Sequence, residues 1–368
     1  YWGYDGFRPG QAEVIDSILS GHDTLALMPT GGGKSITFQV PALANPGICL
    51  VISPLVALMK DQVKNLQKRG ILSAFISSEM PHWEILQQLD NCILGDYKFL
   101  YISPERISSE LFQEKLKTLS SKVNLLVVDE AHCISQWGND FRRDYRLIAD
   151  IRDAIPHVQV IAVTASATAA VVADICEQLH FRKGYRIFKT SFERKNLSFV
   201  VRKTDNKLKE ICHILSAVPG SAVIYSRTRK GVEEYAGKLR AAGISAEYFH
   251  AGLDPVLKTE RQADWVKGFT RVLVATNAFG MGIDKGDVRV VIHTEFPDSM
   301  EAYYQEAGRA GRDGKRAYAV ALLGPQDITD IKRRPSNAFP TIEYIKRVYE
   351  ALCNRFQIAE GDGEGVSV

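Results

Sequence analysis

The sequence predicts an α/β protein built from two tandem domains, each a parallel sheet with helices on both faces. Its 368 residues exceed what one ordinary core organises, so about two domains are expected for this length. Short apolar runs alternate with amphipathic segments of helix length, which is the pattern of parallel β-α-β units. This alternation stops at a polar segment near the middle of the chain and then starts again.

In the first half, short aliphatic and β-branched runs mark the strands. The expected strands are Thr24–Met28, Ile48–Ile52, Phe99–Ile102, Leu125–Asp129 and Val160–Thr164. The segments between them have the length and patterning of helices, as in Lys34–Ala42 and Leu55–Arg69. Strands that alternate with helices in this way form a parallel sheet covered on both faces.

The second half repeats the alternation. Its expected strands are Ala222–Tyr225, Ala246–Phe249, Val272–Ala275, Val290–His293 and Tyr318–Leu322. The polar and charged stretch Thr190–Ser198 separates the two units, so we expect domains over residues 1–192 and 193–335. An amphipathic segment with a basic face, Ile342–Phe356, follows Pro340. Residues 336–368 are therefore expected to form a helical extension, either the start of a further domain or a cap on the second domain.

Composition excludes several classes of protein. The chain is 45% hydrophobic and 24% charged, which is typical of a soluble globular protein. No apolar stretch approaches the roughly 18 residues of a membrane span, and the start, Tyr1–Tyr4, lacks the regions of a secretory signal. A net charge of +3 permits nucleic-acid binding, but any basic track has to be local. The six cysteines form no C-x-x-C pair, so neither disulfides nor a zinc site is expected.

A glycine-rich loop follows the first expected strand and precedes a helix. Its sequence runs from Pro29 to Ser35 (PTGGGKS), and strand, glycine loop and helix together are the setting of a phosphate-binding loop. Glycines allow backbone N–H groups to curl around a phosphate, and the helix N-terminus adds a favourable dipole. We expect Lys34 to bind the β- and γ-phosphates and the Ser35 hydroxyl to bind magnesium. Met28 replaces the usual leading glycine, and the string alone is also compatible with an ordinary flexible turn.

Two carboxylates stand at the end of the fourth expected strand. Asp129 and Glu130 open the string DEAH, at the strand end where an open α/β sheet places its nucleotide site. Asp129 fits a magnesium ligand, and Glu130 fits the base that orients or deprotonates the attacking water. A solvated pair of strand-end acids is the alternative for the string in isolation. His132 fits either a link from the γ-phosphate to the next strand or simple packing, and TASAT (Thr164–Thr168) fits either a sensing loop or a helix cap.

An aromatic segment follows DEAH directly. Trp137 and Phe141 are interleaved with arginines, of which Arg142 is the first. Stacking of a base on an aromatic ring contributes about 1–3 kcal/mol and tolerates any base, which suits a protein that moves along a strand. Burial of both rings in the core is the alternative, but the glycine, asparagine and aspartate around them favour a loop.

The motifs occur in the order found in superfamily 2 helicases: PTGGGKS, DEAH and TASAT, then YFHAGL and YYQEAGRAGRDG. Three further segments resemble RecQ-type DNA helicases in particular. Residues Gly3–Gln11 (GYDGFRPGQ) are similar to the adenine-reading element of that family, Ser135–Arg142 (SQWGNDFR) to its aromatic-rich loop, and Phe279–Lys285 (FGMGIDK) to its motif V. The resemblance covers roughly residues 1–325, and agreement of this many ordered motifs by chance is negligible.

The resemblance implies two RecA-like domains with ATP and Mg²⁺ in the cleft between them. The implied catalytic residues are Lys34, Glu130, Arg309 and Arg312, with Arg312 as the first choice for an arginine finger. Gln11 has the groups to pair with adenine, and Tyr4 or Arg8 to stack on it. The expected nucleotide ligands are Tyr4, Arg8, Gln11, Thr30, Gly31, Gly32, Gly33, Lys34, Ser35 and Asp284, and the expected metal ligands are Ser35 and Asp129.

The resemblance also implies DNA as the partner, either single-stranded or at a junction with duplex, and 3′-to-5′ movement with unwinding in repair and recombination. The expected DNA contacts are Ser53, Arg106, Trp137, Phe141, Arg142, Arg227, His250 and Thr276. Single-strand-binding or recombination proteins are expected partners, in the cytoplasm of a bacterium or the nucleus of a eukaryote. Cys353 is the only cysteine after Cys212. We therefore expect no zinc in this chain, with the family's four-cysteine module missing or beyond Val368.

Two other kinds of function remain compatible with the same core. An RNA helicase or a double-strand translocase has the same engine, and the aromatic segment after DEAH argues against both. An ATP-gated binding or annealing module is the other alternative. Glu130, Arg309 and Arg312 argue against it, because binding alone does not require them. No wedge for strand separation is identifiable, so ATP hydrolysis with poor unwinding is a further expectation.

Overall fold

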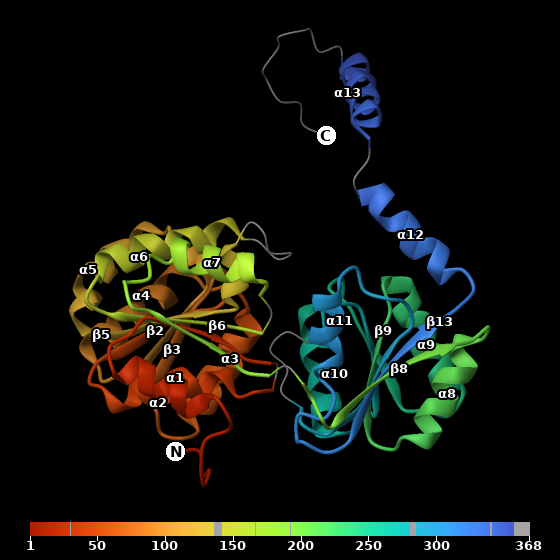
Figure 1. Cartoon of the computed structure of the whole chain (residues 1–368), viewed down its shortest axis with the longest axis horizontal. Coiled ribbons are helices and arrows are strands. Elements are labelled where there is room, and N and C mark those ends of the chain that lie inside the picture. The colour runs from red at the N-terminus through yellow and green to blue at the C-terminus, as the bar shows by residue number, and fades with distance from the viewer. Residues whose placement is uncertain are drawn as a thin grey trace.

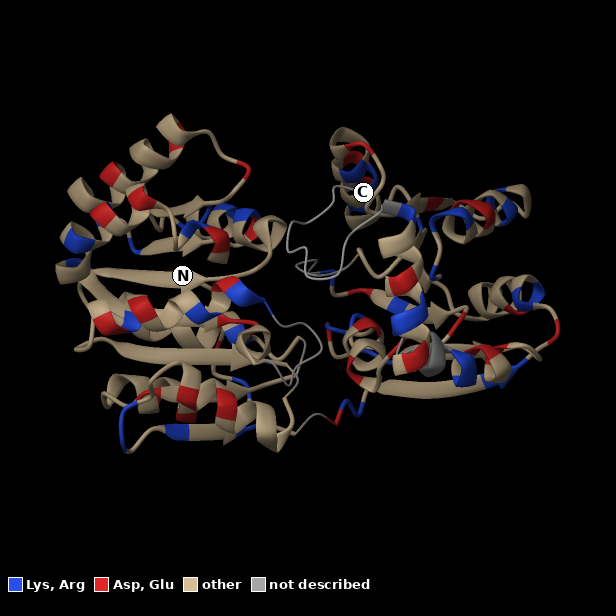
Figure 2. Ribbon diagram, turned by 90° about the horizontal axis from the view of Figure 1, so that it is seen from above, with Lys and Arg blue, Asp and Glu red and all other residues tan. Residues whose placement is uncertain are grey.

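Two parallel β-sheets, each flanked by helices, make up the body of this computed structural model (Figure 1). The structure describes residues 1–29, 31–135, 142–165, 167–191, 193–279, 285–338 and 341–356, with the backbone alone at 334–338 and 356. None of the described helices has both the length and the apolar composition that a bilayer span requires. Basic and acidic residues are interspersed over the helices of both domains (Figure 2).

The first sheet has seven strands in the order β3-β4-β2-β5-β6-β1-β7. The strands are β1 (Thr24–Leu27), β2 (Ile48–Ile52), β3 (Ser73–Ile76), β4 (Phe99–Ile102), β5 (Val123–Asp129), β6 (Gln159–Thr164) and β7 (Arg186–Lys189). The α-helices are α1 (Gln11–Leu19), α2 (Lys34–Ala44), α3 (Val56–Gln67), α4 (His82–Leu94), α5 (Glu110–Leu119), α6 (Ile148–Ala154) and α7 (Ala169–Gln178). Short 3₁₀ turns lie at Pro104–Arg106, Ser120–Lys122, Ala131–Ile134 and Arg143–Leu147.

Helices cover both faces of this sheet, which explains why its central strands are continuous apolar runs. Successive side chains of a strand point to opposite faces. Leu25 and Leu27 of β1 accordingly pack in one core with α4 to α7, whereas Ala26 and Met28 pack in the other with α1 to α3. All four side chains are buried, as expected for a parallel strand in the middle of a layered domain.

The second sheet has six strands in the order β10-β11-β9-β12-β13-β8. The strands are β8 (Leu197–Lys203), β9 (Ser221–Tyr225), β10 (Ala246–Phe249), β11 (Val272–Ala275), β12 (Val288–His293) and β13 (Ala317–Leu323). The helices are α8 (Lys207–Ala217), α9 (Arg229–Ala241), α10 (Pro255–Lys267), α11 (Met300–Ala307), α12 (Asp327–Ala338) and α13 (Ile342–Phe356). The last two helices lead away from this sheet (Figure 1).

The predicted α/β architecture is confirmed. Every expected strand is present, and its ends differ from the expected ones by at most two residues. Strands β3, β7 and β8 were not expected. Because β7 pairs with β1 and β8 pairs with β13, the chain passes from the first sheet to the second between residues 190 and 196, where the expected domain boundary lies.

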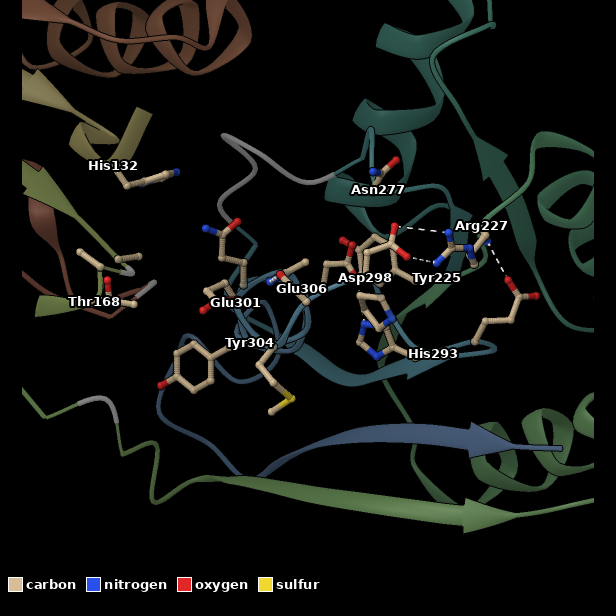
Figure 3. Close-up of a pocket in the computed structure, with 18 of the residues that line it drawn as sticks. His132, Thr168, Tyr225, Arg227, Asn277, His293, Asp298, Glu301, Tyr304 and Glu306 are labelled. Atoms are coloured by element: carbon tan, nitrogen blue, oxygen red, sulfur yellow. Dashed lines mark hydrogen bonds and ion pairs between the residues drawn. The ribbon is translucent and has the colours of Figure 1, made fainter. Parts of the chain in front are cut away.

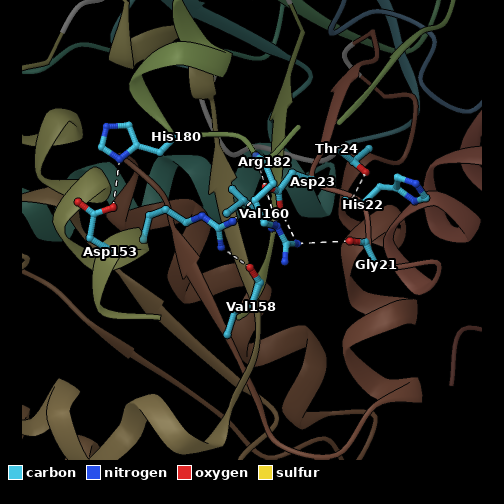
Figure 4. Close-up of polar contacts among 10 residues, drawn as sticks. Gly21, His22, Asp23, Thr24, Asp153, Val158, Val160, His180 and Arg182 are labelled. Atoms are coloured by element: carbon cyan, nitrogen blue, oxygen red, sulfur yellow. Dashed lines mark hydrogen bonds and ion pairs between the residues drawn. The ribbon is translucent and has the colours of Figure 1, made fainter. Parts of the chain in front are cut away.

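A buried carboxylate ties together the amino-terminal ends of β1 and β6 (Figure 4). The side chain of Asp23 is fully buried and accepts hydrogen bonds from the Val160 N–H (2.9 Å), the Arg152 guanidinium (3.0 Å) and the Arg182 N–H (2.8 Å). Arg182 adds a second ion pair to the same carboxylate at 2.9 Å. A buried charge with this full set of donors is compensated, and removal of the carboxylate leaves Arg152 buried without its partner.

Asp23→Ala is therefore expected to lower the free energy of unfolding by about 3–5 kcal/mol, the usual cost of breaking a buried ion pair. A urea titration followed by circular dichroism measures the change. Asp153→Ala is the matched control, because Asp153 forms an exposed pair with His180 in the same region, and exposed pairs contribute little. Equal losses in the two variants would contradict the role assigned to Asp23.

Candidate active site

The loop between β1 and α2 has the shape of a phosphate cradle. Gly31 and Gly33 have φ angles of 78° and 77°, in the left-handed region that favours glycine. A Cβ atom at Gly33 would lie 2.5 Å from Gln11 Nε2, and one at Gly32 would lie 2.9 Å from the Pro29 carbonyl oxygen. Both conformation and space therefore require glycine. The loop delivers Lys34 to the first position of α2, where the helix N-terminus favours an anion.

Two carboxylates from the end of β5 meet Lys34. Glu130 Oε1 lies 3.5 Å from Lys34 Nζ. Asp129 accepts hydrogen bonds from the Glu130 N–H (2.9 Å) and from the Ser53 hydroxyl (3.4 Å). Burial and the charge of Glu130 raise the pKa of Asp129 to about 6, while the charge of Lys34 acts in the opposite direction. The structure thus brings together the lysine and the two acids that the sequence indicated, and a triphosphate with its metal fits this set of donors and acceptors.

Glu130 has an uncommon backbone conformation for a residue with a side chain. Its φ and ψ angles are 47° and 46°, and left-handed backbone in a non-glycine residue costs roughly 1–2 kcal/mol. His132 Nδ1 lies 3.4 Å from Glu130 Oε2 and 2.8 Å from the Thr164 hydroxyl. His132 therefore connects DEAH to the end of β6, where TASAT begins, which is the linking position that the sequence left open.

Arg312 reaches the phosphate loop from the second domain. It borders the same cavity, of about 710 Å³, as Lys34, Asp129 and Glu130. Its Cγ atom lies 3.2 Å from the place where a Cβ at Gly31 would be. An arginine in this position acts on the phosphates only while the two domains are close to each other.

Arg309 has a different environment. It is 9% exposed and does not line the cavity that contains Lys34. It lies beside Tyr225, where burial raises the pKa of the phenol to about 12 and the charge of Arg309 opposes that rise. Of the two expected finger arginines, Arg312 is therefore the one that faces the loop.

The segment Gly3–Gln11, the expected adenine-reading element, contacts the glycine loop directly through Arg8 and Gln11. Gln11 is 3% exposed; its amide oxygen accepts from the Arg8 N–H (2.8 Å), and its Nε2 donates to the carbonyls of Gly32 (3.2 Å) and Gly33 (3.0 Å). The Arg8 guanidinium donates to the Gly31 carbonyl (2.5 Å). Tyr4 is exposed and borders the same cavity. An adenine bound by Gln11 therefore competes with the Gly32 and Gly33 carbonyls for the side-chain amide of Gln11. Recognition of the base by Gln11 stays a prediction.

Three expected DNA contacts are buried. Ser53, His250 and Thr276 are 1%, 5% and 6% exposed. The Ser53 hydroxyl faces Asp129, and His250 Nε2 lies 2.9 Å from Glu233 Oε1. The Ser53 hydroxyl and the His250 imidazole thus have partners within the protein, and contact of these three residues with DNA stays a prediction.

The three expected arginines are accessible to different degrees. Arg106 and Arg142 are half-buried; the Arg106 guanidinium donates to the carbonyls of Ser77 (2.9 Å) and Ser78 (3.2 Å). Arg142 donates to the Pro54 carbonyl (3.3 Å). Arg227 is exposed and pairs with Asp298 at 2.6 Å. Four other expected site residues, Thr30, Trp137, Phe141 and Asp284, lie outside the described residues.

A second cavity, of about 850 Å³, lies between the domains beside α11 (Figure 3). The first domain contributes His132 and Thr168, and the second contributes Tyr225, His293 and Glu306. His293 is fully buried, lies 2.8 Å from Glu306 Oε2 and stacks on Tyr225 at 5.4 Å. Sequence reasoning missed the pair of His293 and Glu306. The available signal was a histidine at the carboxyl end of an apolar strand, the position where such sheets place functional groups.

Comparisons with known proteins agree with this arrangement. Residues 8–175 match the family model described as DEAD/DEAH box helicase, and residues 206–314 match the helicase conserved C-terminal domain. The chain is 44% identical over 331 residues to the "ATP-dependent DNA helicase RecQ" of Bacillus subtilis, covering 89% of this chain and 56% of the relative. For the protein of the same name from Pasteurella multocida the identity is 41% over 350 residues, covering 94% and 55%. The chain thus spans about half the length of these relatives.

A solved structure with the same architecture is the helicase Lhr of Mycobacterium smegmatis, bound to single-stranded DNA and AMP-PNP. It superposes with a TM-score of 0.70 at 21% identity, over 89% of this chain and 47% of that chain. A likeness at this level of identity shows the fold: two RecA-like domains in tandem.

Proposed function

Since the chain belongs to the RecQ-type helicases, we propose that it hydrolyses ATP to move 3′ to 5′ along single-stranded DNA and to separate duplex strands. One observation carries this proposal. Lys34, Asp129 and Glu130 of the first domain border one cavity together with Arg312 of the second. A site divided between two domains links the state of the nucleotide to the distance between the domains, as a motor requires.

Lys34, Ser35 and Asp129 are the residues that would hold ATP and Mg²⁺. Bound Mg²⁺ neutralises charge on the β- and γ-phosphate oxygens. The Lys34 ammonium, 3.5 Å from Glu130 in this structure, turns to the phosphates when ATP binds. Glu130 is then free to accept a proton from the attacking water at its carboxylate. Arg312 donates to the γ-phosphate oxygens from the opposite side of the cleft.

Because the site is shared by two domains, hydrolysis changes the distance between the domains, and this change drives movement. His132 relays the state of Glu130 to Thr164 through its contacts to both (3.4 and 2.8 Å). Closing of the cleft brings the DNA-contacting surfaces of the two domains together, and opening separates them, so repeated cycles advance the chain along a strand. The direction, the role in repair and recombination, and partners such as single-strand-binding proteins follow from the relatives as proposals. We propose the cytoplasm of a bacterium or the nucleus of a eukaryote as the compartment.

The test is the steady-state ATPase rate without nucleic acid, with single-stranded DNA and with single-stranded RNA. We expect stimulation by DNA in preference to RNA. Trp137→Ala is expected to raise the DNA concentration for half-maximal stimulation about 5- to 150-fold, because one stacking contact contributes about 1–3 kcal/mol. Trp83→Ala is the matched control, since Trp83 is an exposed tryptophan on α4 of the same domain.

Equal stimulation by RNA would favour the RNA-helicase alternative. An ATPase rate that no polynucleotide changes would contradict the proposal that the chain is a motor. Unwinding and polarity are measured separately with short duplexes that carry either a 3′ or a 5′ single-stranded tail. Unwinding restricted to the 3′-tailed duplex is the expected result. Preference for the 5′ tail would contradict the proposed direction.

A further inference from the structure

The segment that joins the two domains lies beside the phosphate loop. Thr190 donates from its backbone N–H and its hydroxyl to the Leu27 carbonyl (3.0 and 3.2 Å), at the end of the strand that leads into the glycine loop. Thr190 also packs against Gly10 of the adenine-reading element. The joining segment is thus anchored to the first domain immediately beside the phosphate cradle.

Four residues after Thr190, the same segment contacts the second domain through Arg194. Its guanidinium donates to three carbonyl oxygens of the turn after α11: Gly308 (3.2 Å), Ala310 (2.9 Å) and Gly311 (2.9 Å). Its Nε donates to the side chain of Asn196 (3.3 Å). A planar guanidinium with several donors fixes the relative positions of such carbonyls, whereas a lysine ammonium has one nitrogen.

Asn196 also binds this turn. Its Nδ2 donates to the carbonyls of Gly311 (2.7 Å) and Lys315 (2.8 Å). A Cβ at Gly311 would lie 2.6 Å from this nitrogen, and Gly311 has a φ angle of 62°. The turn is therefore closed around Arg194 and Asn196, and no larger residue fits at its centre.

This turn carries Arg312. A Cβ at Gly31 of the phosphate loop would lie 3.2 Å from Arg312 Cγ and 3.8 Å from Arg194 Nη1. Arg194 therefore lies between the phosphate cradle and the turn that bears the arginine finger. Through Thr190, the segment also connects that turn to the strand before the loop.

We infer that Arg194 is a positioning residue: it holds the 308–311 turn in the shape that directs Arg312 at the γ-phosphate. The inference rests on the proposed function. Arg194 acts through Arg312 and does not replace it. Because the same segment joins the domains, a displacement of one domain relative to the other changes where Arg312 is presented.

The test compares Arg194→Ala and Arg194→Lys with the parent, each with and without Arg312→Ala. We expect kcat for ATP hydrolysis to fall about 10²-fold in both single variants, because a displacement of about 1 Å costs on that order, with KM for ATP within a few-fold of the parent. Lysine is not expected to rescue. The double variants are expected to be no slower than Arg312→Ala alone, since residues that act through one another are not additive. Arg202→Ala, which removes an exposed pair with Glu210, is the matched control.

Hydrogen exchange gives a readout that does not depend on turnover. The amides of the 308–311 turn and of the three residues after it are expected to exchange faster in Arg194→Lys than in the parent, while the amides of β11 do not change. Additive losses of kcat, full activity of Arg194→Lys, or unchanged exchange in the turn would each overturn the inference. If the parent does not hydrolyse ATP, the proposed function is contradicted instead. The exchange measurement would still decide the role of Arg194.

Discussion

Arg312→Ala is expected to lower kcat for ATP hydrolysis about 10³- to 10⁵-fold, the usual contribution of an arginine finger. The guanidinium stabilises charge that develops on the γ-phosphate, so its loss affects the transition state far more than the bound substrate. Affinity for a non-hydrolysable ATP analogue is therefore expected to stay within a few-fold of the parent. The measurements are steady-state hydrolysis with saturating single-stranded DNA and equilibrium binding of a fluorescent nucleotide.

Arg316→Ala is the matched control for Arg312→Ala, because Arg316 is an exposed arginine four residues later that lies over the ring of Tyr318. We expect its hydrolysis rate to equal that of the parent. If Arg309→Ala keeps the melting temperature of the parent but loses more ATPase activity than Arg312→Ala, then Arg309 and not Arg312 is the arginine finger. The buried position of Arg309 beside Tyr225 leads us to expect a loss of stability there instead.

Glu130→Gln is expected to lower kcat about 10²- to 10⁴-fold, the typical contribution of general acid–base catalysis. The amide retains the shape of the side chain but does not accept the proton of the attacking water. In the parent, Lys34 is 3.5 Å from the Glu130 carboxylate, and the neutral amide no longer competes with the phosphates for that ammonium. Nucleotide binding is therefore expected to be equal to that of the parent or tighter.

Single-turnover hydrolysis and nucleotide binding separate these two effects of Glu130→Gln. Glu177→Gln is the matched control, because Glu177 lies on the exposed side of α7 in the same domain. A Glu130→Gln variant that turns over within tenfold of the parent would show that another group accepts the proton.

The parts of the site that were predictable from sequence are those encoded in contiguous residues. A strand, three glycines, Lys34 and a helix form one local unit, and Asp129 with Glu130 ends another apolar strand of the same sheet, separated from the first by β6. Because the carboxyl ends of parallel strands meet at one edge of a sheet, their convergence followed from the fold class. Arg194 and the pair of His293 with Glu306 were not predictable in this way. Their contacts join residues far apart in sequence. The strand-end position of His293 was a local signal, but no local pattern indicated Glu306 as its partner or distinguished Arg194 from a surface residue.

The same distinction applies to the strands. β7 and β8 were not expected because they lie at the edges of their sheets and keep largely exposed side chains, so they lack the continuous apolar run of a central strand. Ser53 shows a different ambiguity. A small hydroxyl residue at a strand end fits both a surface contact and a buried partner for Asp129 (3.4 Å), and only the three-dimensional arrangement separates the two.

The place of β1 in its sheet determines when the phosphate loop forms during synthesis. β1 pairs with β6 and β7, so that Thr24 lies opposite Ile161 and Arg186. At roughly 5–20 residues per second, the first strand therefore waits on the order of 10 to 30 s for both of its neighbours. Pairing across so long a stretch of chain is slow. We therefore expect the nucleotide site to be completed late in synthesis, together with the first domain.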